Sequence, residues 1–412
     1  MAVPSMVKFR RQAQCLAPDL FMKQRFKKFL SISVLVALIG AMVAPLRAEP
    51  IVPTRDDEVI EVLPAMRGNR VEERRLRKQL AQQPKDPVLA LSVAKRYLDQ
   101  AHELGDPRFA GMAMSAIEGW TDEATMPEGI LLMRANLQQY MHEFDASARS
   151  LQRLLARPSA QPRPQAWLTL ATVRRVQGRY ADSDAACLQV AQAGAALHSN
   201  ACKAENAALR GDADGARATF SQLLATPALA VATQAWLTTS LAELEQRAGH
   251  ASAADAAFRK ALTLDADSYA TLAYADFLIE QKRPREALVL LKGQARSDAV
   301  VLRLAIAGTQ AKVASAAADS SEMRERINLA NERPDAKVFH GREQAMFALF
   351  VEGQPERALE LARGNVAQQR EPLDLLVLAQ ASRASRQPAA LQEAQRLTRE
   401  VGLRDARVQA LL

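Results

Sequence analysis

The chain has little glycine, few aromatic side chains and almost no cysteine. Of its 412 residues, 17 are glycine and 5% are aromatic. Alternation of apolar and polar residues is scarce beyond residue 64, so sheet structure is not indicated there, and the low aromatic content fits helices packed through Ala and Leu. The three cysteines contain no CxxC pair, which argues against a redox motif or a zinc site. These shortages favour an all-α protein.

Sequence motifs of catalysis and cofactor binding are also missing. The pair His102-Glu103 lacks the second histidine that a zinc-protease helix requires, and none of GxSxG, GxxxxGK[ST] and GxGxxG occurs. The five histidines are scattered without metal-ligand spacing: His102, His142, His198, His250 and His340. The acidic run at 56–58 lies in a linker, where adjacent carboxylates are usually solvated. We predict no catalytic residue, no cofactor and no metal, and a protein that is not an enzyme.

The positive charge of the chain is concentrated at its N-terminus. The whole sequence carries a formal charge of +8, but residues 1–48 hold eight Lys or Arg and a single acidic residue, Asp19. The remainder therefore carries only +1. Residues 49–412 are close to neutral and lack the net positive charge that is typical of nucleic-acid-binding domains, so no nucleic-acid partner is predicted.

The same N-terminal residues have the pattern of a secretory signal peptide. A basic cluster at 23–28 precedes an apolar run at 29–43 and a small-residue cleavage pattern at 46–48. We predict a leader over 1–48, with Met22 as a candidate start. The apolar run is shorter than the roughly 20 residues that a spanning helix needs. The alternative is an uncleaved leader that anchors the protein, and this would be its only contact with a membrane.

The leader is followed by a second segment, residues 49–85. Prolines bracket its acidic and aliphatic first part, which predicts an extended arm. Residues 71–82 then carry dense Glu and Arg at helical spacing, which predicts a short charged helix with Leu76 and Leu80 packed inward. From residue 86 to 412 the pattern is helical almost throughout.

The stretch 167–190 shows the pattern on which the rest of the chain is built. Trp167, Leu170 and Val173 fall at helical spacing, Gly178 breaks the run, and Tyr180 opens a second helical run. Similar stretches follow, and the phrases at 283–288 and 354–359 are near-copies. The second helix of each predicted pair contains a small residue, and these residues follow one another at intervals of 36, 33, 38, 33 and 71 positions: Ser147, Ser183, Ala216, Ala254, Ala287 and Ala358.

This order of residues resembles the tetratricopeptide repeat. The matching positions in the best copy are Trp167, Leu170, Ala171, Gly178, Tyr180, Ser183 and Cys187. The resemblance implies an α-solenoid of antiparallel helix pairs, about eight or nine units over 86–412, in which each pair packs on its neighbours. The phrases at 340–343 and 369–372 are also similar to exported bacterial repeat proteins of uncharacterised function, which supplies no activity.

The resemblance also implies where a partner binds. The first helix of each repeat lines a concave groove, and its second position points inward; those positions are Gln165, His198, Trp236, Tyr269 and His340. Residues further along the same helices are Arg175, Glu243, Asp276, Phe347 and Phe350. An exposed Trp and Tyr in successive repeats are typical anchors for a protein or peptide. The alternative is that Trp236 and Tyr269 pack against the neighbouring helix.

Two cysteines fall on helices that the resembled fold places side by side. In an exported protein Cys187 and Cys202 would then form a disulfide. The alternative is two small buried residues.

The predicted function is a non-catalytic, exported scaffold that binds a protein or peptide in its groove, in the periplasm if the source is a diderm bacterium. Three alternatives stay open. One is a structural component of an envelope assembly or polysaccharide-export complex. The second is the membrane-anchored scaffold. The third is an enzyme that uses the groove as a cleft.

Overall fold

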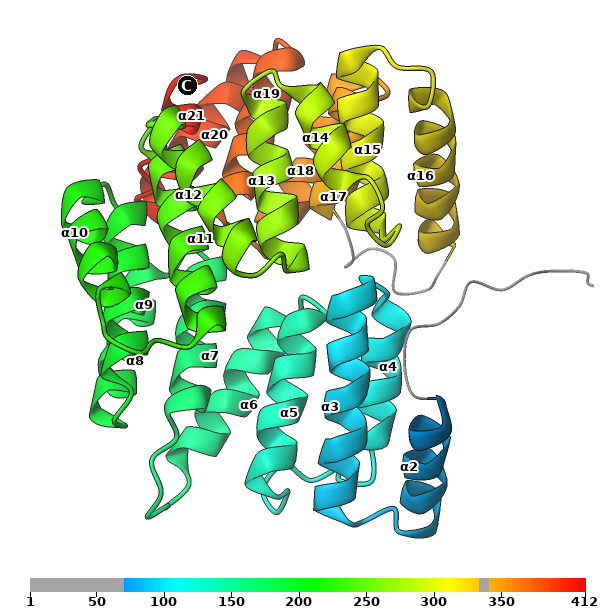
Figure 1. Cartoon of the computed structure of the whole chain (residues 1–412), viewed down its shortest axis with the longest axis vertical. Coiled ribbons are helices and arrows are strands. Elements are labelled where there is room, and N and C mark those ends of the chain that lie inside the picture. Colours follow the sequence, from blue (N-terminus) through cyan, green and yellow to red (C-terminus); the bar gives the residue numbers. More distant parts are fainter. Residues whose placement is uncertain (1–69, 333–340) are drawn as a thin grey trace, which may run out of the picture. The chain divides into compact units, whose positions relative to one another are not determined.

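The computed structural model describes residues 70–332 and 341–412, and every regular element within them is an α-helix. Contacts divide the chain into Met1–Gly68 and Asn69–Leu412, and these helices belong to the second unit. Successive helices pack as antiparallel pairs, and each pair packs on the next (Figure 1). The protein is an all-α solenoid of antiparallel helix pairs, as the sequence predicts.

Helix α2 (Arg70–Gln82) precedes nine helix pairs in the described residues. The first four pairs are α3 (Pro87–Leu104) with α4 (Pro107–Ala116), α5 (Glu128–Tyr140) with α6 (Phe144–Ala156), α7 (Pro164–Val176) with α8 (Tyr180–Gln192), and α9 (Ala196–Leu209) with α10 (Ala213–Leu224). The other five are α11 (Val231–Arg247) with α12 (Ala251–Leu264), α13 (Ser268–Glu280) with α14 (Pro284–Leu291), α15 (Asp298–Ala311) with α16 (Ala316–Asn331), α17 (Gly341–Phe350) with α18 (Pro355–Val366), and α19 (Pro372–Ala384) with α20 (Pro388–Val401). The short helix α21 (Ala406–Gln409) ends the chain, and none of these helices is both long and apolar enough to cross a membrane.

Local sequence signals explain most of the helix boundaries. Asp86 caps α3 by accepting hydrogen bonds from the N–H groups of Val88 and Leu89, and Gly105 ends it in the left-handed conformation. Proline, whose fixed φ suits the first turn, opens seven helices: α3, α4, α7, α14, α18, α19 and α20. The polar Ala/Ser/Asp-rich stretch at 314–321 is not an insertion between helices, because α16 begins at Ala316 within it.

The small residue that recurs in each second helix marks the point where the two helices of a pair meet. Ser147 Oγ donates a 2.7 Å hydrogen bond to the carbonyl of Ala135, and Ser183 Oγ donates a 2.8 Å bond to the carbonyl of Ala171. The alanines that replace serine in later pairs are buried too: Ala216, Ala254, Ala287 and Ala358. The repeat spacing seen in the sequence is therefore a spacing of close helix contacts.

The core is spread along the array rather than gathered at one centre. Buried residues form three clusters, which cover the first pairs, α9 to α11, and the remaining pairs. The last cluster also includes Tyr180 and Leu209, which lie far from it in sequence. The prediction that each pair packs only on its neighbours is therefore incomplete.

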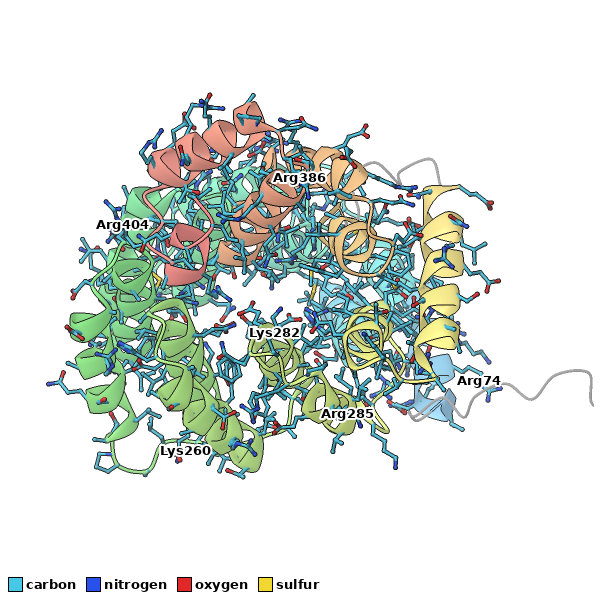
Figure 2. The ribbon with its side chains drawn as sticks, turned by 90° about the horizontal axis from the view of Figure 1, so that it is seen from above. Arg74, Lys260, Lys282, Arg285, Arg386 and Arg404 are labelled. Atoms are coloured by element: carbon cyan, nitrogen blue, oxygen red, sulfur yellow. A yellow bond between two sulfur atoms is a disulfide. The ribbon has the colours of Figure 1, made fainter. Side chains whose placement is uncertain are left out.

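The C-terminal segment packs against the turns of earlier pairs. The N–H of Arg370 donates a 2.7 Å hydrogen bond to the carbonyl of Val176, and the N–H of Arg404 donates a 2.8 Å bond to that of Leu209. Seen from above, the last helices lie beside α9 to α12, with Arg404 at the junction (Figure 2). We call these contacts the closure.

Glycines in the turns leave room for the closure. A Cβ atom on Gly178 would lie 3.0 Å from Val401, and one on Gly211 would lie 3.0 Å from Arg404. Both glycines have positive φ, +74° and +103°. The turns within pairs α7–α8 and α9–α10 thus need glycine for their backbone shape and for the segment that crosses them.

Ion pairs extend the closure to α13. Arg407 bonds Glu280, the last residue of α13, at 3.0 Å and 3.1 Å, and it bonds Asp405 at 2.7 Å. Asp405 is fully buried, and its side chain also accepts the N–H of Arg407 at the start of α21. A buried carboxylate is stabilised only when it is paired and hydrogen-bonded, as it is here.

A second contact joins the turn after α3 to the start of α15. A Cβ atom on Gly105 would lie 2.5 Å from Cβ of Ser297, the residue that caps α15. We therefore expect Gly105→Ala to destabilise the protein more than Gly194→Ala does, by about 1–3 kcal/mol from overpacking. Gly194 is the matched control because its φ is also positive, at +87°, while nothing lies within 4 Å of its Cβ position. Urea unfolding of both variants gives the comparison, and equal losses would show that the 105–297 contact does not constrain the fold.

Candidate functional site

Two adjoining cavities lie along the first helices of the early pairs. The larger has a volume of about 620 Å³ and reaches from α3 across α5 to α7. The smaller, of about 390 Å³, lies among α7, α9 and α11. Both are lined by Leu168 and Thr172 of α7, so they are neighbours along one surface. We call this surface, made by α3, α5, α7, α9 and α11, the first wall.

The larger cavity also has an opposite side, which we call the closing wall. It consists of residues 298–299 at the start of α15, 342–343 in α17 and the lining residues Gln369 and Glu371 before α19. These residues come from pairs that are distant in sequence from the first wall. The closure therefore turns the predicted open groove into an interior site with two walls.

Neutral polar groups cover much of the first wall. Asn136 and Gln139 of α5 and Gln165, Thr169 and Thr172 of α7 all line the larger cavity. Thr169 Oγ1 donates to Asn136 Oδ1 at 3.3 Å. Amide and hydroxyl groups both donate and accept hydrogen bonds, so this wall can pair with the backbone of an extended polypeptide.

The smaller cavity contains an aromatic pair and an ion pair. The rings of His198 and Trp236 stack with centroids 5.7 Å apart and planes 19° apart. Glu205 pairs with Arg175 and accepts a 2.9 Å hydrogen bond from Ser240. Trp236 of α11 thus packs on His198 of α9, and both residues line the smaller cavity. Their role in binding a partner stays a prediction.

Tyr269 lies on α13 and is 63% exposed. Its hydroxyl donates a 2.7 Å hydrogen bond to Glu243 of α11. The charge of Glu243 raises the pKa of Tyr269 above its ordinary value, and Glu371 and Glu205 act in the same direction. Loss of hydration raises the pKa of Glu243, and the guanidinium of Arg247 opposes that rise. Carboxylates from α9, α11 and the closing wall therefore act on one region.

The closing wall is built around Arg342. This guanidinium bonds Glu371 at 3.0 Å and Glu343 at 3.3 Å, and it lies 3.4 Å from Asp374. Asp374 is almost fully buried and accepts 2.8 Å hydrogen bonds from the side chain of Asn365 and from the N–H of Glu371. Burial raises the pKa of Asp374 to about 7, helped by the charge of Glu371 and opposed by Arg342.

Several other residues that the sequence placed in the groove either pack in the core or form an ion pair with a neighbouring helix. Phe347 is in the core, with 2% of its surface exposed, because α17 packs that face against its neighbours. Phe350 is only partly buried and packs on the same cluster. Asp276 forms a 2.6 Å ion pair with Arg303 of α15. His340 lies outside the described residues, so its place in the groove stays a prediction.

Sequence reasoning missed the closing wall. The stretches containing Arg342 and Glu371 were noticed only as phrases shared with other repeat proteins. Their meeting with α3, α5 and α7 depends on the curvature of the whole array, which no local pattern encodes. Arg370, which donates to Val176, is one residue from Glu371, so the closure itself positions this carboxylate.

Cys187 and Cys202 are joined by a disulfide, with sulfur atoms 1.97 Å apart and Cα atoms 5.9 Å apart. The bond links α8 to α9, and Cys202 also lines the smaller cavity. Both residues are buried, at 0% and 3% exposure. The bond therefore fixes α9, which carries His198 and Glu205, against the preceding pair.

No group of three or more His, Cys, Asp or Glu side chains in residues 70–332 and 341–412 is arranged to hold a metal ion. The acidic run at 56–58 lies outside these residues.

No family model and no curated protein matches the chain. Among solved structures, it is similar to a Rap protein whose crystal structure contains bound competence and sporulation factor. The two chains share 12% sequence identity and a TM-score of 0.47, over 83% of this chain and 92% of that one. A likeness at this level carries no argument about function, which has to come from the side chains described above.

The buried carboxyl of Asp374 makes stability depend on pH. The pKa of Asp374 is higher in the folded state than in the unfolded state, so protonation of this carboxyl stabilises the fold. This stabilisation is complete below about pH 4 and is lost as the pH rises through about 7. We expect the stability of Asp374→Asn, which cannot titrate, to fall less than that of the parent between about pH 5 and about pH 8. Thermal unfolding across this range is the measurement, and parallel curves for the two proteins would contradict the raised pKa.

Proposed function

We propose that this protein is a non-catalytic, exported scaffold that holds a segment of another polypeptide between its first wall and closing wall. One observation carries the proposal: adjoining cavities run along the first helices of the early pairs and present aromatic, amide and hydroxyl groups together. Their volumes, about 620 Å³ and about 390 Å³, lie in the range typical of ligand sites.

The chemistry of the cavity suits binding of a chain rather than reaction with it. Neutral donors and acceptors on α5 and α7 match a peptide backbone, and Trp236 offers a broad apolar face beside them. The charged groups of the wall are bonded to one another, as Arg175 is to Glu205 and Arg342 is to Glu371. Such pairs hold the wall in shape before a ligand arrives, which lowers the cost of binding.

Export is supported by two independent features. The first 48 residues have the pattern of a signal peptide. The disulfide between Cys187 and Cys202 is the second, since such bonds persist in oxidising compartments. In a diderm bacterium that compartment is the periplasm.

Trp236, which lines the smaller cavity, and the exposed Tyr269 should be necessary for capture of a partner. We expect Trp236→Ala with Tyr269→Ala to lose the proteins that the parent retains in a crosslinking pull-down from the native envelope, because both variants remove exposed aromatic area from the interior. Trp120→Ala is the control, because Trp120 packs on the core cluster of the first pairs and neither lines a cavity nor contacts a residue that does so on α9 or α11. Helical circular dichroism has to be unchanged in all variants. Retention of the same partners by the double variant would move the binding surface away from the interior.

Export makes a separate prediction about the covalent state of the native protein. We expect the intact mass to match a chain that begins at Glu49, because the leader is removed. The mass should also be lower than that of the reduced chain by two hydrogen atoms, because the disulfide forms. Mass spectrometry before and after reduction measures both. An N-terminus that retains residues 29–43 would support the anchored alternative, and free thiols in the native protein would argue against an oxidising compartment.

A further inference from the structure

Aromatic rings are scarce in this chain, yet several of them gather at one end of the larger cavity. Phe, Trp and Tyr make up only 5% of the sequence. Four rings from α3, α5, the turn after α5 and the start of α6 line this cavity: His102, Tyr140, His142 and Phe144. The rings of His102 and Tyr140 meet edge to face, with centroids 4.9 Å apart and planes 90° apart. Those of His142 and Phe144 are tilted, with centroids 5.5 Å apart. We call the part of the cavity lined by these four rings the aromatic end.

The first wall and the closing wall meet beside the aromatic end. Gly105 and Pro107, in and after the turn that follows α3, line the cavity next to the rings. Gly105 leaves no room for a Cβ atom against Ser297, and residues 298–299, at the start of α15, line the cavity as well. The opposite end continues along α7 toward the smaller cavity. A cavity bounded on both sides at one end and continuing at the other suits a ligand whose side chain enters the bounded end while its main chain follows α7.

The charged groups of the larger cavity are already engaged with groups of the protein itself. Asp298 bonds Arg326 at 2.6 Å. Glu343 and Glu371 both bond Arg342, at 3.3 Å and 3.0 Å. These pairs account for every Asp, Glu and Arg of the lining within residues 70–332 and 341–412. A charged side chain of a ligand would therefore lose its hydration without meeting an unbonded partner, whereas a neutral side chain has no such cost.

The two rings that meet edge to face are themselves neutral. Loss of hydration lowers the pKa of His102, and the charge of Asp99 opposes this shift, so the imidazole is neutral near pH 7. Burial raises the pKa of Tyr140 to about 12, and its hydroxyl donates a 3.0 Å hydrogen bond to the carbonyl of Ala101. What these residues offer a ligand is ring surface. A further aromatic ring gains from edge-to-face and offset contacts with such rings more than its buried area alone provides.

Side-chain amides lie next to the rings. Gln139 of α5 and Gln165 of α7 line the larger cavity, and neither side chain is hydrogen-bonded to another described residue. Each amide can donate to a main-chain carbonyl and accept from a main-chain N–H. An extended segment can thus be held along α5 and α7 while one of its side chains reaches the aromatic end.

We propose that the aromatic end is the anchor site for one Phe, Tyr or Trp side chain of an extended polypeptide segment, whose main chain pairs with Gln139 and Gln165. This inference rests on the proposed function, because it names the side chain by which the scaffold recognises its segment. A Leu side chain would fill the space but lack the ring contacts. A Lys or Arg side chain would meet ring faces but no unbonded carboxylate of the lining, so the site discriminates against it.

The test begins with selection from a displayed library of random peptides on the purified protein, with its disulfide intact. We expect one position of the retained peptides to be enriched in Phe, Tyr and Trp and not in charged residues. The best peptide is then synthesised with blocked ends, beside versions in which this residue is replaced by Ala, Leu or Lys, and binding is measured by fluorescence anisotropy. The Ala and Lys versions should bind at least about tenfold more weakly, the equivalent of about 1.4 kcal/mol. The Leu version should bind about three- to tenfold more weakly.

Variants of the rings locate the anchor. Tyr140→Leu removes a ring but keeps an apolar side chain, and it should weaken the aromatic peptide by about three- to tenfold. Tyr140→Phe is the matched control, because it loses the same hydrogen bond to Ala101 but keeps the ring, and it should bind like the parent. His102→Ala, on a different helix, should weaken the aromatic peptide by a similar factor. Neither Tyr140→Leu nor His102→Ala should change the affinity for the Ala peptide.

The outcomes separate this inference from the proposed function. Peptides that share no aromatic position, and whose binding is lost in Trp236→Ala with Tyr269→Ala, would overturn the anchor while leaving a peptide-binding interior. A Leu or Lys version that binds as tightly as the selected peptide would also overturn it, because bulk or charge would then be recognised in place of a ring. Equal affinities in the parent, Tyr140→Leu and His102→Ala would place the anchor elsewhere. A folded protein that retains no peptide would overturn both proposals.

Discussion

The contact between the C-terminal segment and the turns of earlier pairs is the constraint on which the interior depends. Residues 401–407 cross the turns at Gly178, Gly211 and Gly249 and end at Glu280. The backbone hydrogen bond from Arg404 to Leu209 fixes the register of this crossing, and the one from Arg370 to Val176 ties the segment before α19 to the same region. A solenoid is commonly treated as a chain of nearest-neighbour interfaces. In this one, repeats at distant positions also stabilise each other, so losing a late pair would cost more than a single interface.

The closure explains why ionisable groups gather inside. Each pair alone places a few charges at its inner side, as α9 places Glu205 and α11 places Glu243, where water would screen them. The closure places the starts of α17 and α19 opposite the first wall. This adds Arg342, Glu371 and Asp374 to the charged groups of the same region. The raised pKa of Asp374 follows from this arrangement, because burial removes hydration that one shared guanidinium restores only in part.

The local parts of this structure were readable from the sequence, and the long-range parts were not. Helical periodicity, turn glycines and the recurring small residue predicted the pairs, because each signal concerns residues within about 40 positions of each other. The same logic placed His198 and Trp236 at equivalent positions of adjacent repeats, and the two rings stack in the structure. The closing wall was missed because a small rotation between successive pairs, summed over many pairs, decides which distant residues meet. Phe347 shows the same limit within one repeat: its position fitted the groove pattern, yet the packing of α17 turned it into the core.

An interior with two walls couples ligand binding to the integrity of the array. A segment that contacts Trp236 on α11 and Glu371 on the closing wall binds only the form in which the two walls face each other. Its binding free energy therefore adds to that of the closure, by the general rule that a ligand stabilises the state it binds. In the empty protein the closure also brings Glu371 and Asp374 together, and Arg342 lies against both, so their repulsion is offset within the wall itself. The closing wall is therefore held in shape by its own ion pairs, and a bound segment adds stability through its contacts with both walls rather than by neutralising charge.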